Sequence, residues 1–394
     1  MKILYHHRTQ GRGVERVHIM GIVNALRESG HKVDILSVPG ADLKEIEDKN
    51  VSIVRKKSIL GFVSSKLHGS IFEMIEIAYN FLILIRIPNV LRKSRYDFVY
   101  ERYSLFMFAT VFICKIIRKP IILEINDSVL VPRVRKCYLK PIAKLFEKWT
   151  FKNATGLVII STVFKDIIVD NYGELRNYVI SPNAVNLKDL PDVSVADVDA
   201  LKLELGIAEG DVICGYTGAF HEWHGVRWFV DLLLSKLEKE SRLKVLMVGD
   251  GPLFAEIEDK ISKKQMSSNI ILTGRVPHSE INLYLSVMDY AVMPDSNTYG
   301  SPMKIFEYMA KKLAVIAPAY GPIAETVIDG KTGWLTPVSE HEQLVDMLIS
   351  ASNDKDELNS VGNNAFQYIL NERQWKNNAS QIFEMLNTGK NSKC

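Results

Sequence analysis

Short apolar runs alternate with longer stretches of helical periodicity along most of the chain. Residues 2–5 form an apolar run, a helical pattern covers 14–29 and ends at Gly30, and a second strand pattern covers 31–38. A strand, a helix and a strand in this order predict parallel α/β architecture. The alternation continues with strands expected at 98–100, 121–125, 156–160 and 177–180, and with helices near 69–93, 104–118, 138–152 and 162–172.

A polar, aspartate-rich stretch at 186–210 has no periodicity and is predicted to be a linker. A second series of strands is expected beyond it, followed by two helical patterns near 340–370 and 375–388. The 394 residues fit two domains of roughly 150–200 residues each. Two doubly wound domains joined by a linker form a cleft, and ligands bind at the carboxyl ends of such strands. The strands of the second series are expected at 212–217, 244–248, 269–273, 290–293, 314–317 and 333–336.

Charge is distributed unevenly between the two halves. Residues 1–190 contain 30 Lys and Arg against 18 Asp and Glu, a balance of +12, whereas residues 191–394 contain 19 against 28, a balance of −9. A basic half joined to an acidic half indicates that the basic half meets something anionic. Anionic lipid, a lipid-linked phosphate and nucleic acid are the candidates, and nucleic acid is disfavoured because no base-stacking module accompanies the basic residues.

The cysteines and the N-terminus favour a cytoplasmic location. Cys114, Cys137, Cys214 and Cys394 form no C-x-x-C pair, so we expect reduced thiols. The N-terminal strand turns polar at His6, which is not the pattern of a signal peptide. No apolar run reaches the roughly 18 residues of a transmembrane helix.

One apolar segment, residues 71–90, is flanked by basic residues at 56–66 and 92–95, and a second basic run covers 133–148. Such a segment can lie on an anionic bilayer surface. It can equally be a core helix beside a solvated basic face, and both interpretations stay open. A peripheral position on the inner face of the cell membrane is the expectation that follows from the first.

The strongest candidate site is the start of a helix at 301–310. Pro302 suits a first turn, and Gly300 and Ser301 are expected to leave backbone amides open there. Lys304 and Glu307 are three residues apart and share one helix face. A cation near a diphosphate and a carboxylate that accepts from ribose hydroxyls would suit a nucleotide-sugar, although a surface ion pair gives the same spacing.

Other loops are predicted at the same strand edge. His221 and His224 lie between a strand and a helix, and a metal pair there lacks a third ligand nearby. Gly11 and Gly13 match a dinucleotide fingerprint only in part, because Arg16 stands where a third glycine is needed. The remaining loops contain Gly218 and Gly225, Gly249 and Gly251, and Arg275 with Val276.

These motifs together resemble the family-4 retaining glycosyltransferases, in particular the branch that assembles bacterial polysaccharides. The resemblance rests on F-x-x-W-H-G at 220–225, P-x-K-x-x-E-Y-M-A at 302–310 and the segment 316–335, and it extends to 100–104, 124–127 and 181–185. It implies the GT-B fold, with a first, acceptor-binding domain at 1–190 and a second, donor-binding domain at 191–375. The domains would face each other across a cleft, and the last helix, about 376–394, would cross back to the first.

The resemblance also implies roles for individual residues. Glu307 would hold the donor ribose, Lys304 and His224 would face the diphosphate, and Asn126 and Asp127 would lie beside the reacting sugar. Arg102 and Glu124 are assigned to the acceptor side. The donor-binding residues would be Gly11, Gly13, Gly218, Trp223, Gly225, Gly249, Gly251, Arg275, Val276, Tyr299, Gly300, Ser301, Pro302 and Met303.

Three positions depart from the common family pattern. Tyr299 replaces the first of two glutamates, Ala219 replaces an arginine, and His224 replaces a lysine. Lys304 is the cation that would compensate. The D-x-D at 197–199 falls in the predicted linker, so we expect no metal and no other cofactor; cations and oriented amides would stabilise the leaving diphosphate.

We therefore expect transfer of a sugar, with retention, from a nucleotide diphosphate-sugar to a lipid-linked or saccharide acceptor in capsule, O-antigen or exopolysaccharide assembly. A nucleotide-sugar epimerase on the same scaffold is the alternative enzyme. A non-catalytic sugar- or lipid-binding protein is the third possibility, because the first glutamate is missing. Product analysis separates the three.

Overall fold

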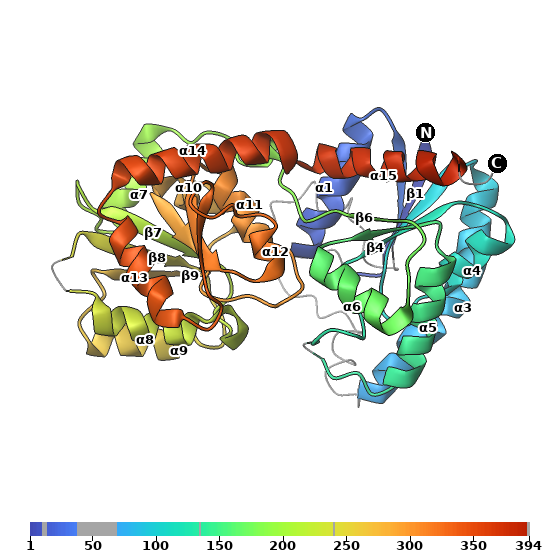
Figure 1. The fold of residues 1–394 in the computed structure, drawn as a ribbon, viewed down its shortest axis with the longest axis horizontal. Helices are drawn as coiled ribbons and strands as arrows, with labels where there is room; N and C mark the ends of the chain where they lie inside the picture. The colour runs from blue at the N-terminus through green and yellow to red at the C-terminus, as the bar shows by residue number, and fades with distance from the viewer. Residues whose placement is uncertain (10–13, 38–68, 134, 239–240, 392–394) are drawn as a thin grey trace. The chain divides into compact units, whose positions relative to one another are not determined.

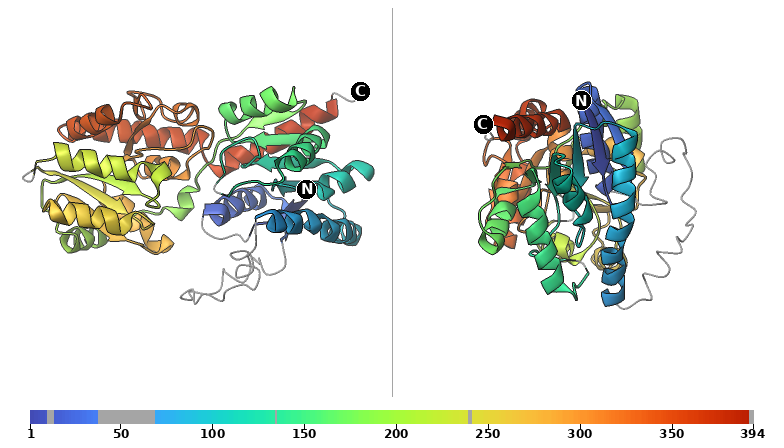
Figure 2. Two further views of the ribbon diagram at one scale, coloured as in Figure 1. Left: turned by 90° about the horizontal axis from the view of Figure 1, so that it is seen from below. Right: turned by 90° about the vertical axis from the view of Figure 1, so that its right-hand side faces the viewer.

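The computed structural model describes all residues except 10–13, 38–68, 134, 239–240 and 392–394. The chain divides into two compact units, one comprising Met1–Pro182 with Lys376–Cys394 and the other comprising Asn183–Trp375. In the described part of the chain, each unit contains a six-stranded parallel sheet with helices on both faces (Figures 1 and 2). The predicted fold class, α/β with two doubly wound domains, is confirmed.

The sheet of the first unit has the strand order β2-β1-β3-β4-β5-β6. Most of its strands are apolar runs that are buried on both faces, because helices cover both sides of a parallel sheet. The order reverses between β1 and β3, and ligands bind at the carboxyl ends of strands at such a point. The elements are β1 (Lys2–His6), α1 (Val14–Glu28), β2 (Lys32–Leu36), α3 (Gly69–Lys93), β3 (Phe98–Arg102), α4 (Ala109–Ile116), β4 (Ile121–Ile125), α5 (Lys140–Asn153), β5 (Gly156–Ile159), α6 (Thr162–Tyr172), β6 (Tyr178–Ile180) and α15 (Trp375–Asn391).

The sheet of the second unit has the order β12-β11-β10-β7-β8-β9. This is the order of a dinucleotide-binding fold, and its reversal lies between β7 and β10. The elements are α7 (Val195–Glu204), β7 (Val212–Thr217), α8 (Val226–Lys236), β8 (Leu243–Val248), α9 (Phe254–Lys263), β9 (Ile270–Gly274), α10 (Ile281–Val287), β10 (Tyr290–Val292), α11 (Met303–Ala310), β11 (Ala314–Pro318), α12 (Gly321–Ala324), β12 (Gly333–Thr336), α13 (His341–Ala351) and α14 (Lys355–Glu372), with short 3-10 turns at η2 (Leu187–Asp189), η3 (Glu222–His224) and η4 (His278–Glu280).

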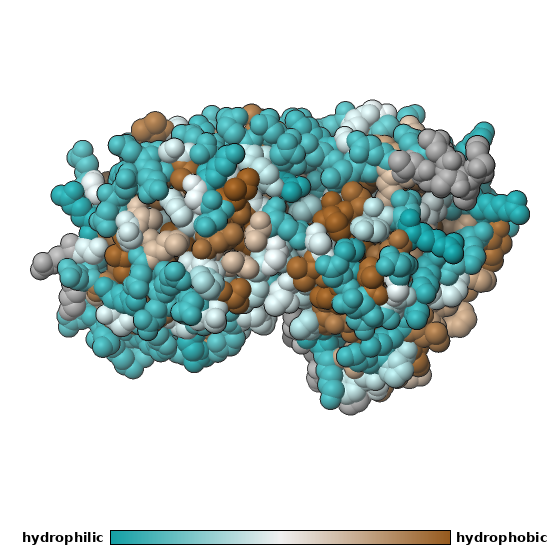
Figure 3. Space-filling view, in the orientation of Figure 1, coloured by the Kyte–Doolittle hydropathy of each residue, from teal (hydrophilic) through white to brown (hydrophobic). Residues whose placement is uncertain are grey.

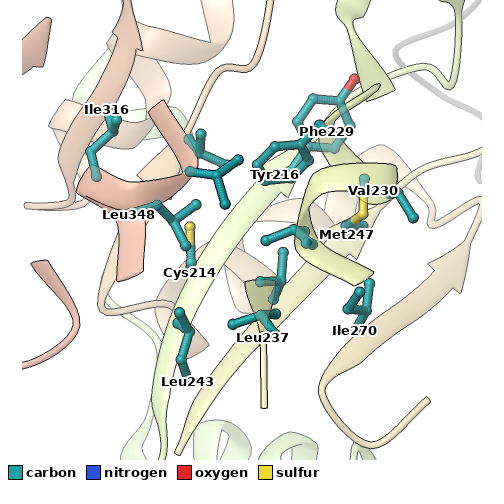
Figure 4. Packing of buried hydrophobic residues seen from close by; sticks show 14 of the residues in the cluster. Cys214, Tyr216, Phe229, Val230, Leu237, Leu243, Met247, Ile270, Ile316 and Leu348 are labelled. Atoms are coloured by element: carbon teal, nitrogen blue, oxygen red, sulfur yellow. The ribbon is translucent and has the colours of Figure 1, made fainter. Parts of the chain in front are cut away.

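Alternate residues of the central strand β7 point to opposite faces of the second sheet. Cys214 and Tyr216 pack with α8, α9 and α13 in one apolar cluster (Figure 4), whereas Ile213 packs with α10, α11 and α14 in another. The period of two in a strand produces this division. Both faces of the sheet are therefore covered by apolar clusters. Polar side chains at the carboxyl ends of the strands lie outside these clusters.

The structure divides the chain at Pro182 and not at residue 190. Val185 pairs with Gln374, and Leu187 and Leu190 pack against the core of the second unit. The stretch 186–210 is also not a plain linker, because it contains η2 and α7. The side chain of Ser194 accepts a hydrogen bond from the Asp197 N–H and so begins α7.

Two helix boundaries differ from the sequence pattern. The helix expected at 104–118 begins only at Ala109, because Asn80 from α3 accepts hydrogen bonds from the backbone N–H groups of Phe108 and Ala109. The pattern at 340–370 is two helices, since Asp354 caps the start of α14 through the Glu357 N–H. Both interruptions depend on single polar side chains, which periodicity does not reveal.

The last helix, α15, completes the core of the first unit. The ring of Phe383 packs at a tilt against His31 and meets the edge of Phe98. Met385 packs closely on β5, because a Cβ added to Gly156 would lie 2.8 Å from its sulfur. Within the described residues, no helix is long and apolar enough to cross a membrane.

Candidate functional site

The loops that follow β7 and β10 lie where the strand order of the second unit reverses. The loop after β7 contains Gly218 and leads through η3 to α8, and the loop after β10 leads to α11. Parallel sheets of this order bind ligands at that point. Most of the predicted donor residues are in these two loops or at the start of α11.

Glycines let the loops after β7 and β8 touch backbone to backbone. Gly249 has φ of +144°, and a Cβ there would overlap the carbonyl oxygen of Gly218. A Cβ on Gly251 would lie 2.6 Å from the carbonyl oxygen of Phe220. Any side chain at these positions would push the two loops apart. Gly249 and Gly251 therefore shape the site, whatever else they contact.

The amine of Lys304 lies directly against the loop after β7. Its Nζ would be 2.6 Å from a Cβ on Gly218, and it stands 4.7 Å from the centroid of the Tyr216 ring. The Tyr216 hydroxyl donates to the carbonyl oxygen of Ala219 at 3.0 Å, which fixes the ring. Nζ is buried and, among the described residues, has no hydrogen-bond partner. Burial lowers the pKa of Lys304 to about 8, and Glu307 only partly offsets this effect.

Glu307 lies one turn further along α11. Burial raises the pKa of Glu307, while His278 and Lys304 act in the opposite direction. Because Lys304 Nζ has no hydrogen-bond partner, the two residues do not form the surface ion pair that their spacing also allowed. His278, which begins η4, was not singled out by its sequence, and only the fold brings it near Glu307.

His224 is neutral at physiological pH. Burial, followed by the charges of Lys304 and His221, lowers the pKa of His224 to about 3. Its Nδ1 is buried and accepts or donates no hydrogen bond among the residues that the structure describes. His224 can therefore donate a hydrogen bond to an anion but does not contribute a positive charge. Lys304 is the cation of this pair.

The neighbouring aromatic ring of Trp223 is half exposed, with 50% of its surface accessible. His221 stacks on it with ring centroids 4.0 Å apart and planes 11° from parallel. His221 is thus engaged with the indole ring. In the described part of the chain, no group of three His, Cys, Asp or Glu residues could hold a metal ion.

The expectation of open backbone amides at Gly300 is wrong. The side-chain oxygen of Asn297 accepts hydrogen bonds from the N–H groups of Tyr299 and Gly300, because asparagine readily bonds to backbone two or three residues ahead. Ser301 is also engaged: its hydroxyl accepts from the Asn183 N–H at 3.0 Å, and its carbonyl accepts from the Asn183 amide. These bonds fix the approach to Pro302, which directly precedes Met303 at the start of α11.

The loop after β9 contributes Arg275 and Val276. Arg275 is exposed, whereas Val276 packs against the apolar cluster around α10 and α11. A base-binding role for either stays a prediction. Gly225 lies at the junction of η3 and α8 with φ of +69°, and Trp228 and Asp295 leave no room for a side chain there.

Glu124 is the centre of a buried hydrogen-bond network in the first unit. Arg102 on β3 faces Glu124 on β4 in register, and its guanidinium donates to the carboxylate at 2.6 Å. The Tyr100 hydroxyl donates to the second carboxylate oxygen at 3.0 Å, and the Asn126 amide donates to the first. His18 lies 3.2 Å away. Glu124 is therefore fully engaged and positions Arg102 and Asn126.

Asp127 points away from this network. Its carboxylate pairs with Arg133 and is partly exposed, and it also accepts from the Ser128 N–H at 2.8 Å. The structure thus brings Arg102, Glu124 and Asn126 together and places Asp127 in a separate ion pair. Gly11 and Gly13 lie outside the described residues.

A second cationic cluster was missed by sequence reasoning. Arg8 follows β1 and donates to Glu76 on α3 at 2.8 Å, and Arg135 pairs with the other oxygen of Glu76 at 3.1 Å. The second guanidinium nitrogen of Arg8 is buried and has no hydrogen-bond partner in the described parts of the chain. In the sequence, Arg135 is one member of a basic run. The convergence of Arg8 and Arg135 on Glu76 could not be inferred without the fold.

Two family models match the chain, one on each half. A model described as Glycosyltransferase Family 4 matches residues 12–189, and one described as Glycosyl transferases group 1 matches residues 211–354. Together they span most of both units.

Relatives and solved structures agree with these models. The 2-deoxystreptamine glucosyltransferase of Streptomyces kanamyceticus is 24% identical over 189 residues, 48% of each chain. The alpha-monoglucosyldiacylglycerol synthase of Acholeplasma laidlawii is 22% identical over 363 residues, 88% of this chain and 86% of that one. The chain spans about half the length of most curated relatives that it matches.

The crystal structure of HepE from Anabaena in complex with UDP-glucose superimposes with a TM-score of 0.69 at 16% identity and covers 98% of this chain and all of that one. This likeness shows the fold. With one glycosyltransferase model on each unit and the same two-sheet fold in the solved structures, the chain belongs to the family-4 glycosyltransferases of the GT-B fold.

Proposed function

We propose that this chain transfers a sugar, with retention, from a nucleotide diphosphate-sugar to a lipid-linked or saccharide acceptor in surface polysaccharide or glycolipid assembly. The observation that carries the proposal is the buried amine of Lys304 at the strand reversal of the second unit, which has no hydrogen-bond partner in the described part of the chain. A buried cation without a partner is costly, and an anionic ligand would supply one. Relatives such as the lipopolysaccharide 1,2-N-acetylglucosaminetransferase of Salmonella typhimurium favour this class of acceptor.

The chemistry follows from the charges of the site. When the sugar–phosphate bond breaks, negative charge grows on the leaving diphosphate, and oriented positive groups stabilise it. Lys304 provides the charge and His224 a hydrogen bond, while Glu307 would accept from the ribose hydroxyls. These residues would carry out transfer without a metal. The proposed place of action is the inner, cytoplasmic face of a membrane, where a lipid-linked acceptor would be available.

Product analysis tests the proposal. The full chain is incubated with UDP-glucose or another nucleotide-sugar and a bacterial lipid extract. A new glycoside with the anomeric configuration of the donor supports it. An isomerised sugar formed without acceptor would favour an epimerase, and unchanged donor despite binding would favour a non-catalytic protein; either result overturns the proposal.

The activity should depend on the protonation of Lys304. The pKa of Lys304 in the ligand-free protein is about 8, so its positive charge is lost as pH rises through that value. Because kcat/KM reports the pKa values of the free enzyme, kcat/KM should fall above pH 8. In Lys304→Arg the guanidinium stays charged, so whatever activity remains should lose this alkaline decline. An identical decline in both proteins would show that another group is responsible.

A further inference from the structure

Helices α3, α4 and α5 of the first unit expose a continuous set of large apolar side chains. Phe81 and Ile85 on α3 are 70% and 65% exposed, Ile116 on α4 is 63% exposed, and Leu145 on α5 is 65% exposed. Apolar side chains gather along the right-hand edge of the view in Figure 3, where Figure 1 places these helices. We call this surface the α3–α5 face; its other exposed apolar members are Ile71, Met74, Ile75, Leu82, Leu84, Phe112 and Ile142.

The three helices form one layer. α3 packs against α4, and α4 packs against α5. Aromatic contacts join the last two: the ring centroids of Phe108 and Phe146 are 4.8 Å apart, and those of Phe112 and Trp149 are 6.3 Å apart. The exposed residues therefore belong to one layer of packed helices in the first unit.

α3 is apolar on two sides. Ile83 and Ile87 are buried in the unit, whereas Phe81 and Ile85 face outward. A helix whose outer side faced only water would carry polar residues there. The helix is therefore both part of the core and an exposed apolar surface, and exposed patches of this kind mark interaction sites.

The face has basic residues but no exposed carboxylate. The three helices contain only three acidic residues, Glu73, Glu76 and Glu147, and each is turned inward in the structure. Glu73 accepts from two backbone N–H groups, Glu76 pairs with two arginines, and Glu147 accepts from Ser128, Tyr103 and Tyr172. Exposed basic residues remain at Arg92, Lys93, Lys115, Lys140, Lys148 and Lys152.

We infer that the α3–α5 face docks on an anionic lipid bilayer, with its apolar side chains in the headgroup boundary and its lysines against the phosphates. Lipid binding needs this combination of buried apolar area and cationic charge. A soluble protein partner would have to match both a wide apolar area and a surface without carboxylates. The inference goes beyond the proposed reaction, because it concerns a surface separate from Lys304 and Glu307.

The face also lies beside the carboxyl edge of the first sheet. Glu76 on α3 holds Arg8, which follows β1, and Arg135 rests on the ring of Phe72 at 3.8 Å. A lipid-linked molecule in the bilayer would thus find its anionic head near Arg8 and Arg135. The same helix connects the lipid surface to the acceptor side of the unit.

Flotation with vesicles tests the inference on the full chain. Wild-type protein should float with mixed phosphatidylglycerol and phosphatidylcholine vesicles and much less with phosphatidylcholine alone. Phe81→Ser/Ile85→Ser should lower the partition coefficient at least about tenfold, because two apolar side chains no longer insert. Lys140→Gln/Lys148→Gln should lower it about thirtyfold on anionic vesicles, at roughly 1 kcal/mol per lysine.

Matched controls come from the second unit. Val195→Ser/Leu203→Ser removes apolar residues that are 75% and 82% exposed, and Lys263→Gln/Lys264→Gln removes the same charge from α9 and its end; both should float like wild type. Thermal melts with and without UDP report that each variant is folded and still binds at the other site. Unchanged flotation in both α3–α5 variants would overturn the inference. The inference would also be overturned if the wild-type protein did not float and instead formed a dimer that Phe81→Ser/Ile85→Ser dissociates. In that case a second copy of the chain would cover the face.

Discussion

Lys304→Met should lower turnover by roughly a hundred- to a thousandfold, the usual effect of removing one group that stabilises the charge of a transition state. The amine of Lys304 lies beside Gly218 and has no hydrogen-bond partner within the described residues. The same change should raise the melting temperature of the ligand-free protein at neutral pH. The pKa of Lys304 is about 8 in the folded chain and 10.5 ordinarily, which means that folding disfavours its charged form.

The difference in stability between Lys304→Met and the wild-type protein should narrow as pH rises. Between about 8 and 10.5 the unfolded lysine still binds a proton that the folded one has lost, so wild-type stability increases relative to Lys304→Met. Steady-state kinetics and thermal melts over this range measure both effects. Lys264→Met, on an exposed residue after α9, is the control. A variant that loses activity only in step with its melting temperature would mean that Lys304 is structural.

Glu307→Ala should weaken donor binding about a hundredfold, because each hydrogen bond to a charged group contributes roughly 1.5–3 kcal/mol. Glu307 is placed near Lys304 and His278, and the proposed function assigns it the ribose hydroxyls. Titration calorimetry with UDP and with UDP-glucose measures the loss. It should be similar for both ligands, since both contain the ribose.

Two further variants sharpen this test. Glu307→Gln keeps an acceptor oxygen and should bind with intermediate affinity, whereas Glu258→Ala, at an exposed position on α9, should bind like wild type. Wild-type affinity in Glu307→Ala would place the nucleotide elsewhere. A loss seen with UDP-glucose but not with UDP would move Glu307 to the sugar end of the site.

Local sequence was sufficient to predict most of the strands. The run at 121–125 is a strand with those bounds, and 212–217 is another, because a buried parallel strand is an apolar run whatever its neighbours. Helix starts were less predictable where the cap comes from a distant residue, as Asn80 does for α4. The sequence showed that Asn80 is polar, but not which helix it would cap.

The candidate site was predictable in its residues but not in its contacts. Glycines and a lysine–glutamate pair beside predicted strand ends indicated the loops after β7 and β10. The contact between the Lys304 amine and Gly218 depends on how the loops after β7 and β10 pack together, which the sequence does not show. Arg102 and Glu124 pair because adjacent strands set their register, and their separation along the chain contains no information on that register.

The return of α15 to the first unit has a consequence for synthesis. Domains generally fold as units while the chain emerges from the ribosome, and the second unit, Asn183–Trp375, is complete as soon as its last residue appears. The first unit begins earlier but must wait for Phe383 and Met385, which cover His31, Phe98 and Gly156. The portion made first is therefore finished last, and a nascent chain that stalls near residue 375 would display an open hydrophobic seam to chaperones.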